Sequence, residues 1–249
     1  MDEDMDKKSD DNVILECKNL VKIYKTEETE VMALQKLGLV INKGELMAII
    51  GKSGSGKSTL LNIIGGLETP TIGKVIYKGV EINTFTEKEL TEYRRNNIGF
   101  VWQKSILNLF PYLTVIQNIE WNAYMNGKEK NRKQIHENAL RLLDEVGLSD
   151  RANSYPTQLS GGEQQRAAIA VSLINEPEIL LADEPTGAVD EHTKDKLQEL
   201  FKSLNKNLGI TVIIVTHDMS LADSVDRVVI ISDGKIVSER VMSEDIKAK

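Results

Sequence analysis

The chain has 249 residues, of which 41% are hydrophobic, and its 31 Lys and Arg residues against 38 Asp and Glu give a formal net charge of −7. This size suits one large globular domain or a domain with an inserted subdomain, and the charge lacks the basic excess expected of a protein that wraps nucleic acid or lies on an anionic membrane. Apolar runs such as residues 45–50 stop far short of the roughly 20 residues that a membrane-spanning helix requires.

The first residues and the cysteine content add two further expectations. Residues 1–12 mix acidic and basic side chains without a following apolar segment, so we expect a disordered acidic tail and no secretory signal. Cys17 is the only cysteine, which excludes an internal disulfide and makes a reducing cytoplasm the natural compartment. Because Cys17 lies in the apolar run VILEC, we expect a buried core thiol.

The hydrophobic pattern predicts an α/β core. Residues 13–40 are expected to form short strands around Tyr24 with a charged turn at 27–30. Further strands are predicted at 45–50, 98–102, 179–183, 211–216 and 227–231, and helices at 57–66, 130–146, 163–175 and 194–208. The strands are apolar without alternation, which favours a parallel sheet buried on both faces. Asp233-Gly234 signals a type I′ hairpin, so an antiparallel ribbon should close the chain. Residues 104 to about 157 are mainly helical and indicate an insertion.

Residues 51–58 form a phosphate-binding motif. They read GKSGSGKS, which fits G-x-x-x-x-G-K-[ST], and they stand directly between a predicted strand and a predicted helix. The glycines let successive backbone N–H groups point at phosphate oxygens, and the helix N-terminus adds its positive dipole end. Lys57 is expected to bridge the β- and γ-phosphates, and the Ser58 hydroxyl to bind Mg²⁺. The alternative is a glycine-rich turn that binds no nucleotide.

An acidic strand end follows at residues 179–184, which read ILLADE. An apolar strand places Asp183 and Glu184 at the carboxyl edge of the sheet, where ligands of such folds bind. Two carboxylates there need a cation nearby, so Asp183 is expected to hold Mg²⁺ and Glu184 to polarise the attacking water as general base. Taken alone, the segment is also compatible with a simple turn.

Residues 159–166, LSGGEQQR, open a predicted helix with a serine cap and two glycines, which is the pattern of a second phosphate site. One ATP does not need two such loops in one pocket, which raises the possibility that this loop serves the nucleotide of another copy. A capped helix start without nucleotide contact is the alternative. The motif between the phosphate loop and LLADEP resembles the signature of ABC-transporter ATPases, and the resemblance covers residues 13–237.

This resemblance implies a fold and a domain division. The fold would be α/β, a P-loop RecA-like core with an N-terminal antiparallel β subdomain and an inserted α-helical subdomain. The ATPase domain would span residues 13–249, with the core at 13–103 and 165–249 and the helical subdomain at 104–164.

The resemblance also implies the members of the site. The catalytic residues would be Glu184, His217 and Gln103, and the metal ligands Ser58, Gln103 and Asp183. The nucleotide-binding residues would be Tyr24, Gly51, Ser53, Gly54, Ser55, Gly56, Lys57, Ser58, Thr59, Ser160, Gly161, Gly162 and Asp190. Among these, Tyr24 matches the aromatic residue that stacks on adenine, Asp190 the aspartate that communicates across a dimer, and His217 the switch histidine at the γ-phosphate. The alternatives are a tyrosine packed on a strand face for Tyr24, an exposed loop glutamine for Gln103 and a structural role for His217.

The family resemblance implies ATP and Mg²⁺ as cofactors, a head-to-tail homodimer in the ATP-bound state, and integral membrane permease subunits as partners. It implies no nucleic acid, and a location on the inner face of the cell membrane through the permease. Residues 25–34, NIIGGLETPTIGKV and ADEPTGAVD resemble the group of macrolide exporters, lipoprotein-release ATPases and the cell-division ATPase. The segment KSILNLFPYLTV after Gln103 is about two residues longer than usual in that group. The alternative function is a regulatory ATPase that controls the cell wall or division through a membrane partner.

Overall fold

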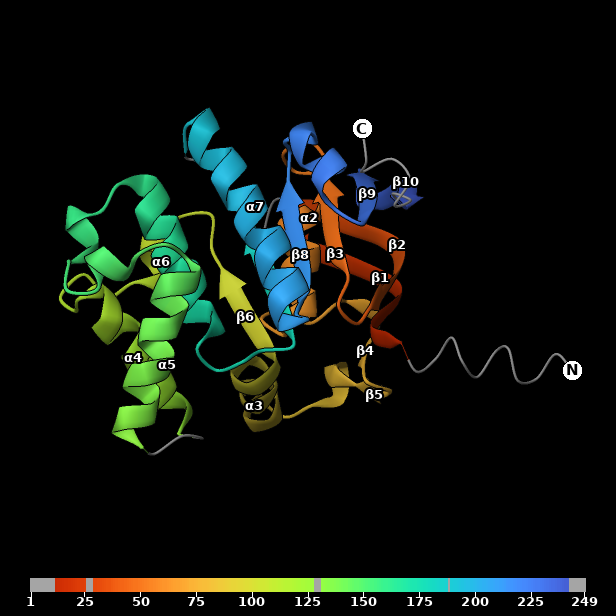
Figure 1. Ribbon diagram of the computed structural model, residues 1–249. Coiled ribbons are helices and arrows are strands. Elements are labelled where there is room, and N and C mark those ends of the chain that lie inside the picture. Colours follow the sequence, from red (N-terminus) through yellow and green to blue (C-terminus); the bar gives the residue numbers. More distant parts are fainter. Residues whose placement is uncertain (1–11, 26–28, 128–130, 188, 242–249) are drawn as a thin grey trace, which may run out of the picture.

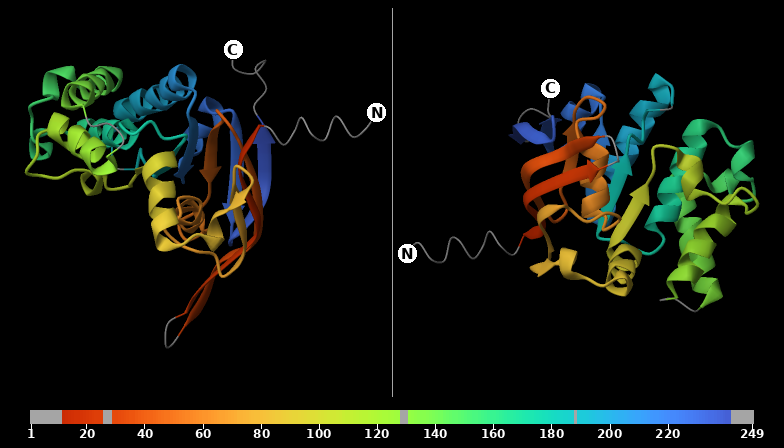
Figure 2. Two further views of the ribbon diagram at one scale, coloured as in Figure 1. Left: turned by 90° about the horizontal axis from the view of Figure 1, so that it is seen from below. Right: turned by 180° about the vertical axis from the view of Figure 1, so that it is seen from behind.

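The computed structural model describes residues 12–25, 29–127, 131–187 and 189–241, so that residues 1–11 of the predicted tail lie outside it. Two sheets and a group of helices make up the described chain (Figure 1). The antiparallel sheet lies at one end of the molecule, the helical group at the other, and the larger sheet with its covering helices lies between them (Figures 1 and 2).

The larger sheet has six strands in the order β10-β9-β3-β8-β7-β6. Its strands are β3 (Leu46–Ile50), β6 (Ile98–Val101), β7 (Ile179–Asp183), β8 (Thr211–Thr216), β9 (Arg227–Ser232) and β10 (Lys235–Val241). The five predicted strands pair in parallel, as the uninterrupted apolar runs indicated, and β10 joins β9 in the antiparallel sense. Asp233 and Gly234 between them both have positive φ, 49° and 73°, which confirms the type I′ turn.

Helices cover both faces of this sheet and explain its apolar strands. Ala48 and Ile50 of β3 belong to one core cluster with helices α6 (Gly161–Leu173) and α7 (Glu191–Leu208), whereas Met47 and Ile49 belong to a second cluster with α2 (Lys57–Ile64). Successive strand residues therefore face different cores, each of them apolar. The three helices lie at the predicted positions, and their ends differ by a few residues from the predicted ends.

The second sheet is antiparallel, with the order β2-β1-β4-β5. It consists of β1 (Val13–Lys25), β2 (Glu30–Asn42), β4 (Ile72–Tyr77) and β5 (Val80–Glu81). This confirms the N-terminal antiparallel β subdomain, although β4 and β5 were not among the predicted strands. Cys17 on β1 is buried, and burial followed by the nearby Glu16 charge raises the pKa of its thiol to about 12, as suits an inert core residue.

The region after β6 is helical, as predicted. It contains α4 (Val115–Asn126) and α5 (Arg132–Glu145) together with α6, and the short 3₁₀ turns η2 (Ser105–Asn108), η3 (Ser149–Arg151) and η4 (Pro156–Gln158). Neither α4 nor α3 (Glu87–Asn97) was predicted individually, yet both begin with a capping box, Thr114 with Gln117 in α4 and Thr86 with Glu89 in α3. These capping patterns were the sequence signal for the two helices.

The loop before α4 is held by one buried side chain. Asn118, only 2% exposed, accepts a hydrogen bond from Phe110 N at 2.6 Å and donates to the carbonyls of Phe110, Leu113 and Thr114 at 3.1, 3.0 and 2.9 Å. Two side-chain N–H groups thus serve three carbonyls. The Asn118 amide therefore makes four of the hydrogen bonds that hold the C-terminal half of the segment after Gln103.

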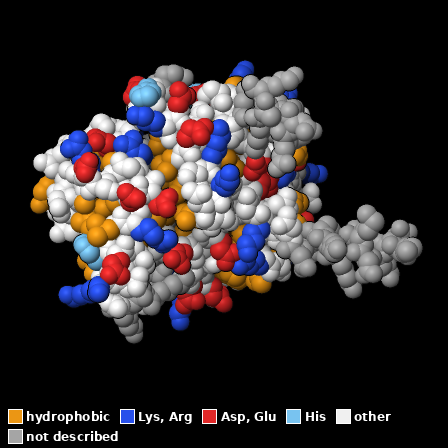
Figure 3. Space-filling view, in the orientation of Figure 1, with side chains coloured by type: hydrophobic (Ala, Val, Ile, Leu, Met, Phe, Trp, Pro, Cys, Tyr) orange, Lys and Arg blue, Asp and Glu red, His pale blue; other side chains and the backbone are white. Residues whose placement is uncertain are grey.

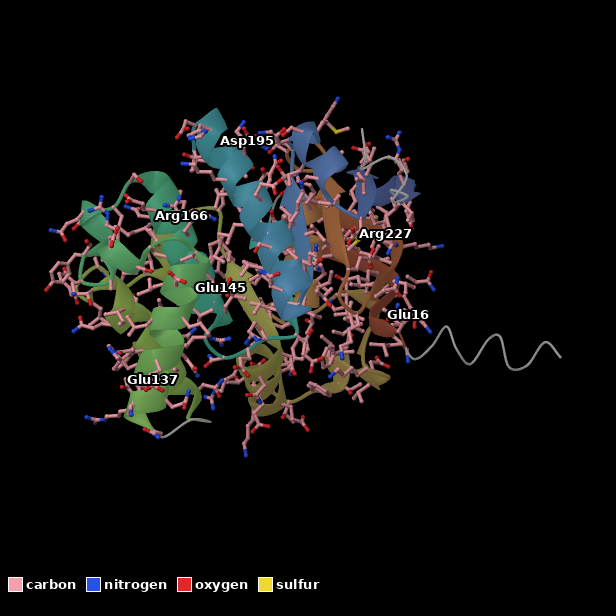
Figure 4. The ribbon with its side chains drawn as sticks, viewed as in Figure 1. Glu16, Glu137, Glu145, Arg166, Asp195 and Arg227 are labelled. Atoms are coloured by element: carbon pink, nitrogen blue, oxygen red, sulfur yellow. The ribbon has the colours of Figure 1, made fainter. Side chains whose placement is uncertain are left out.

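One face of the molecule is shown in space-filling form in Figure 3. Charged side chains of both signs are interspersed on the face shown in Figure 3, with apolar areas between them at the helical end. Arg227 on β9 is buried against Glu45 and Glu239, with Nη1 2.8 Å from the Val40 carbonyl, and so ties the antiparallel sheet to the parallel one (Figure 4). Among the described helices, none combines the length and the apolar character needed to cross a bilayer.

Candidate functional site

The phosphate loop, residues 51–58, is shaped by close approaches of backbone. A Cβ at Gly51 would lie 2.3 Å from the Ile231 carbonyl oxygen, and a Cβ at Gly56 would lie 2.4 Å from the Ala33 carbonyl oxygen. Gly56 also has a φ of 100°, which residues with a side chain rarely adopt. Glycine is therefore required at both positions, and the loop turns directly from β3 into α2.

The start of α2 presents unpaired donors to this loop. Its N-cap, Gly56, has no side chain to cap the helix, so the first N–H groups of α2 lack an intrahelical acceptor. Lys57 is buried, with Nζ 2.8 Å from the Gly51 carbonyl, 3.1 Å from the Lys52 carbonyl and 3.7 Å from Glu184 Oε1. A lysine and a helix N-terminus together create a strongly anion-favouring site.

The Ser58 hydroxyl meets the end of β7. Ser58 Oγ donates to Asp183 Oδ1 at 3.1 Å, although the two residues are 125 positions apart. Burial first, and the Glu184 charge in addition, raise the pKa of Asp183 above its ordinary value, against the opposing effects of Ser58 and Lys57. A hydroxyl and a partly buried carboxylate that gains from a nearby cation are oxygen ligands of the kind Mg²⁺ takes when phosphates complete its shell. These residues therefore fit the metal.

Glu184 occupies a strained position beside His217. Its φ is 46°, in the left-handed region that costs a non-glycine residue about 1 kcal/mol or more. Glu184 Oε2 lies 2.7 Å from His217 Nδ1 and 3.3 Å from Thr216 Oγ1, while Oε1 faces Lys57. The carboxylate is thus aimed by three neighbours at the edge of the sheet where the phosphate loop begins.

One cleft unites these groups. It has a volume of about 640 Å³, and its lining includes Ser53, Gly54, Gly56, Lys57, Ser58, Thr59, Gln103, Glu184 and His217. Residues 31–33 of β2 line it as well. Tertiary structure therefore brings together the phosphate loop, the acidic strand end, the glutamine and the histidine that the sequence singled out separately.

The signature segment and Asp190 do not line this cleft. Ser160 and Glu163 form a capping box at the start of α6, which confirms the predicted serine cap. A Cβ at Gly162 would lie 2.4 Å from Thr193 Cγ2 on α7. Asp190 caps α7, and hydrogen bonds from the side chain and backbone of Thr193 lower the pKa of its carboxyl. Within one chain, these residues serve helix starts and lie outside the phosphate cleft.

Tyr24 lies near the end of β1, and its hydroxyl donates to Glu68 Oε2 at 2.6 Å. Glu68 also accepts from Asn62 Nδ2 on α2 and pairs with Lys22 on β1. Neither Glu68 nor Lys22 was singled out from the sequence. No motif marks them, because their chemistry arises only where β1 meets the segment after α2.

The known proteins that are similar to this chain come from one family. Residues 34–187 match the family model described as ABC transporter. An uncharacterized ABC transporter ATP-binding protein of Methanocaldococcus jannaschii, MJ0796, is 44% identical over 233 residues, which are 91% of this chain and 96% of that protein. The macrolide export ATP-binding/permease protein MacB of Pasteurella multocida is 40% identical over 233 residues, or 94% of this chain but only 35% of MacB.

Solved structures agree with these relatives. The dimeric structure of MJ0796 in a post-hydrolysis state, bound to ADP and Pi, superimposes with a TM-score of 0.84 at 42% identity and covers 92% of this chain and 99% of that one. CbiO1 of Clostridium perfringens, part of the transporter complex CbiONQ, gives a TM-score of 0.82 at 29% identity, with 92% and 88% covered. Both structures share the fold over 92% of this chain.

Proposed function

The chain belongs to the ABC transporter family of ATP-binding proteins, and we propose that the residues gathered around its phosphate loop bind and hydrolyse ATP to drive a membrane permease. The observation that carries the proposal is the single cleft that holds Lys57, Ser58, Gln103, Glu184 and His217. ATP hydrolysis with Mg²⁺ and a dimeric arrangement are properties of this family, and the MJ0796 dimer bound to ADP and Pi is one example.

Binding of ATP begins with a change of partners for Lys57. In the structure its ammonium contacts two loop carbonyls and Glu184. We expect it to turn to the β- and γ-phosphates, whose negative charge is greater, while the N–H groups of the loop and of α2 donate to phosphate oxygens. Tyr24 is proposed to stack on the base.

Hydrolysis requires a water molecule oriented for in-line attack on the γ-phosphorus. Glu184 is free to orient that water and accept its proton once Lys57 has moved to the phosphates, and His217 holds the carboxylate through Oε2. Ser58 and Asp183 are proposed to hold Mg²⁺, which would supply positive charge to the phosphates. Gln103 lies at the rim of the cleft and connects β6 with the helical subdomain.

A second copy of the chain is proposed to complete each site. Ser160, Gly161 and Gly162 present a helix start outside the cleft of their own chain, and both half-sites are intact in the sequence. In a head-to-tail dimer each ATP would lie between one copy's phosphate loop and the other copy's signature helix, with Asp190 near the dimer contact. ATP then joins the subunits until hydrolysis removes the γ-phosphate contacts.

The test of this catalytic proposal is Glu184→Gln. The amide keeps the shape but not the base, so kcat should fall by roughly 10²- to 10⁴-fold while ATP binding persists. Size-exclusion chromatography with MgATP should then show a stable dimer. Glu178→Gln, at the opposite end of the same strand, is the matched control and should retain turnover. A Glu184→Gln protein that stays monomeric and hydrolyses ATP normally would refute the assignment.

The permease contact is proposed to lie on apolar side chains at the edge of the helical subdomain. Leu107 in η2 is 67% exposed and Tyr112 is 90% exposed, and Phe110 and Trp121 stack edge to face beside them with centroids 6.4 Å apart. These exposed apolar groups follow Gln103 directly in the chain, so a partner seated there senses changes at the cleft. The segment is also the one that is longer than usual for the group.

Purification of Glu184→Gln from gently solubilised membranes with MgATP tests this contact. A multi-span protein with a large outer domain is expected to co-purify, and Leu107→Glu should abolish its recovery without loss of ATPase activity. Leu140→Glu, on an exposed apolar position of α5, is the control. Recovery of ribosomes, nucleic acid or only the soluble dimer would contradict transport. We propose that the partner holds the ATPase on the inner face of the cell membrane, as an exporter or a force-transmitting system.

A further inference from the structure

The ring of Tyr24 is held by a polar network that no part of the catalytic proposal uses. Its hydroxyl donates to Glu68 Oε2 at 2.6 Å and lies 3.4 Å from Thr59 Oγ1. Lys22 Nζ lies 5.1 Å from the ring centroid, over one of its faces, and 3.2 Å from Glu68 Oε2. Stacking on a base can therefore use only the opposite face of the ring.

Glu68 also connects Tyr24 to the phosphate-loop helix. Asn62 on α2 donates from Nδ2 to Glu68 Oε1 at 2.9 Å, and the Asn62 carbonyl accepts from the backbone N–H groups of Leu67 and Glu68. One carboxylate thus accepts hydrogen bonds from a phenol on β1 and from an amide on α2. The distance between the Tyr24 ring and the phosphate loop is fixed by this shared acceptor.

The segment after α2 is itself fastened to β1, so Glu68 does not move independently. Thr71 N donates to the Val21 carbonyl at 2.8 Å, Ile23 N donates to Thr71 Oγ1 at 3.0 Å, and Lys22 Nζ donates to the Thr69 carbonyl at 2.9 Å. Backbone and side chains therefore hold the segment that carries Glu68 against the three residues of β1 that precede Tyr24.

The protonation states are consistent with this arrangement. Partial burial alone would raise the pKa of Glu68, but the hydrogen bonds from Tyr24, Asn62 and Lys22 outweigh burial, and the pKa lies below its ordinary value. Burial and the bond to Glu68 raise the pKa of Tyr24. At neutral pH the phenol is the donor and the carboxylate the charged acceptor, which is the stronger class of hydrogen bond.

We propose that Glu68 is a positioning residue for the nucleobase: through the Tyr24 hydroxyl it sets the orientation of the stacking ring relative to the phosphate loop, and so controls affinity for nucleotides but not for bare phosphates. This inference rests on the proposed stacking role of Tyr24. Glu68 acts by preorganisation, because a ring that rotates freely loses conformational entropy when a base binds.

ADP and inorganic pyrophosphate are suitable probes, because both carry two phosphates, only ADP carries the base, and neither supplies a γ-phosphate. Titration calorimetry with Mg²⁺ should show that Glu68→Ala weakens ADP binding on the order of ten-fold and leaves pyrophosphate binding unchanged. Steady-state assays should show a raised KM for ATP at a similar kcat. Equal weakening of both ligands would overturn the proposal, since Glu68 would then act on the phosphate loop.

Four further variants separate the possible outcomes. Tyr24→Phe, which removes only the hydroxyl, should weaken ADP binding as much as Glu68→Ala does. The double variant should bind ADP little more weakly than either single variant. Full additivity would mean that Glu68 does not act through Tyr24. Glu81→Ala, which removes a carboxylate of nearly the same side-chain exposure (28% against 27%) from another lysine pair, should leave ADP affinity unchanged. If Tyr24→Ala has no effect on ADP binding, the proposed stacking role of Tyr24 is wrong. If Tyr24→Ala weakens ADP binding and Glu68→Ala does not, only the inference about Glu68 is wrong.

Discussion

Replacing Asn118 by alanine tests how the long loop after Gln103 is held. The substitution removes one accepted hydrogen bond and two donors shared among three carbonyls. The loop they fix is exposed at Phe110 and Tyr112, so the released backbone groups can reach water and each lost bond should cost about 0.5–1.5 kcal/mol, without the full penalty of burial. The total for the four bonds is about 2–6 kcal/mol, which for a chain of this size lowers the unfolding temperature on the order of 10 °C.

Thermal unfolding followed by circular dichroism measures the effect, and Asn122→Ala on the same helix supplies the comparison. Within the part of the chain that the structure describes, Asn122 makes one side-chain bond, from Nδ2 to the Val171 carbonyl at 2.7 Å, so its loss should cost about 1 kcal/mol. Asn118→Asp should be at least as harmful as Asn118→Ala, because a carboxylate oxygen would replace the donor that faces three carbonyls. If Asn118→Ala unfolds at the same temperature as Asn122→Ala, the loop does not depend on this amide.

Other substitutions test the metal edge, the signature turn and the base site. Asp183→Asn removes a half-buried charge beside Glu184, so scanning calorimetry should show a more stable metal-free protein. Mg²⁺-dependent ATP hydrolysis should be lost in this variant. A variant that still hydrolyses ATP in a Mg²⁺-dependent manner would contradict the role of Asp183. Because burial raises the pKa of Asp183, its protonation competes with Mg²⁺ at a higher pH than for an ordinary aspartate, and the Mg²⁺ concentration for half-maximal ATPase activity should rise as the pH falls towards that pKa. Gly162→Ala should destabilise the protein by about 1–3 kcal/mol through its contact with the methyl of Thr193, and Thr193→Ser should restore much of the loss in the double variant, as urea unfolding will show. Because the pKa of Glu68 is lowered in the folded protein, its contribution to stability is complete above the ordinary glutamate pKa and is lost as the pH falls through the folded pKa. Glu68→Gln should therefore flatten the acid side of the curve of unfolding free energy against pH. An unchanged curve would argue against the network.

Local patterns in the sequence were sufficient for the fold class and for the separate motifs. The phosphate loop, the acidic end of β7 and the serine cap of α6 each depend on a few consecutive residues whose chemistry is readable directly, and the apolar strands required a sheet covered on both faces. The hairpin at Asp233-Gly234 was equally local, since two residues with positive φ define the turn. The domain boundaries and the roles of individual site residues remain predictions.

Tertiary structure alone decided which distant residues meet. Ser58 contacts Asp183 across 125 positions, His217 contacts Glu184 across 33, and Tyr24 contacts Glu68 across 44. The order of parallel strands places β3 and β7 on either side of β8, and this order is set by the packing of whole helices and not by any short segment. No sequence motif identifies a carboxylate such as Glu68, because its role depends on contacts with a phenol on β1 and an amide on α2. Only the folded chain brings these groups together.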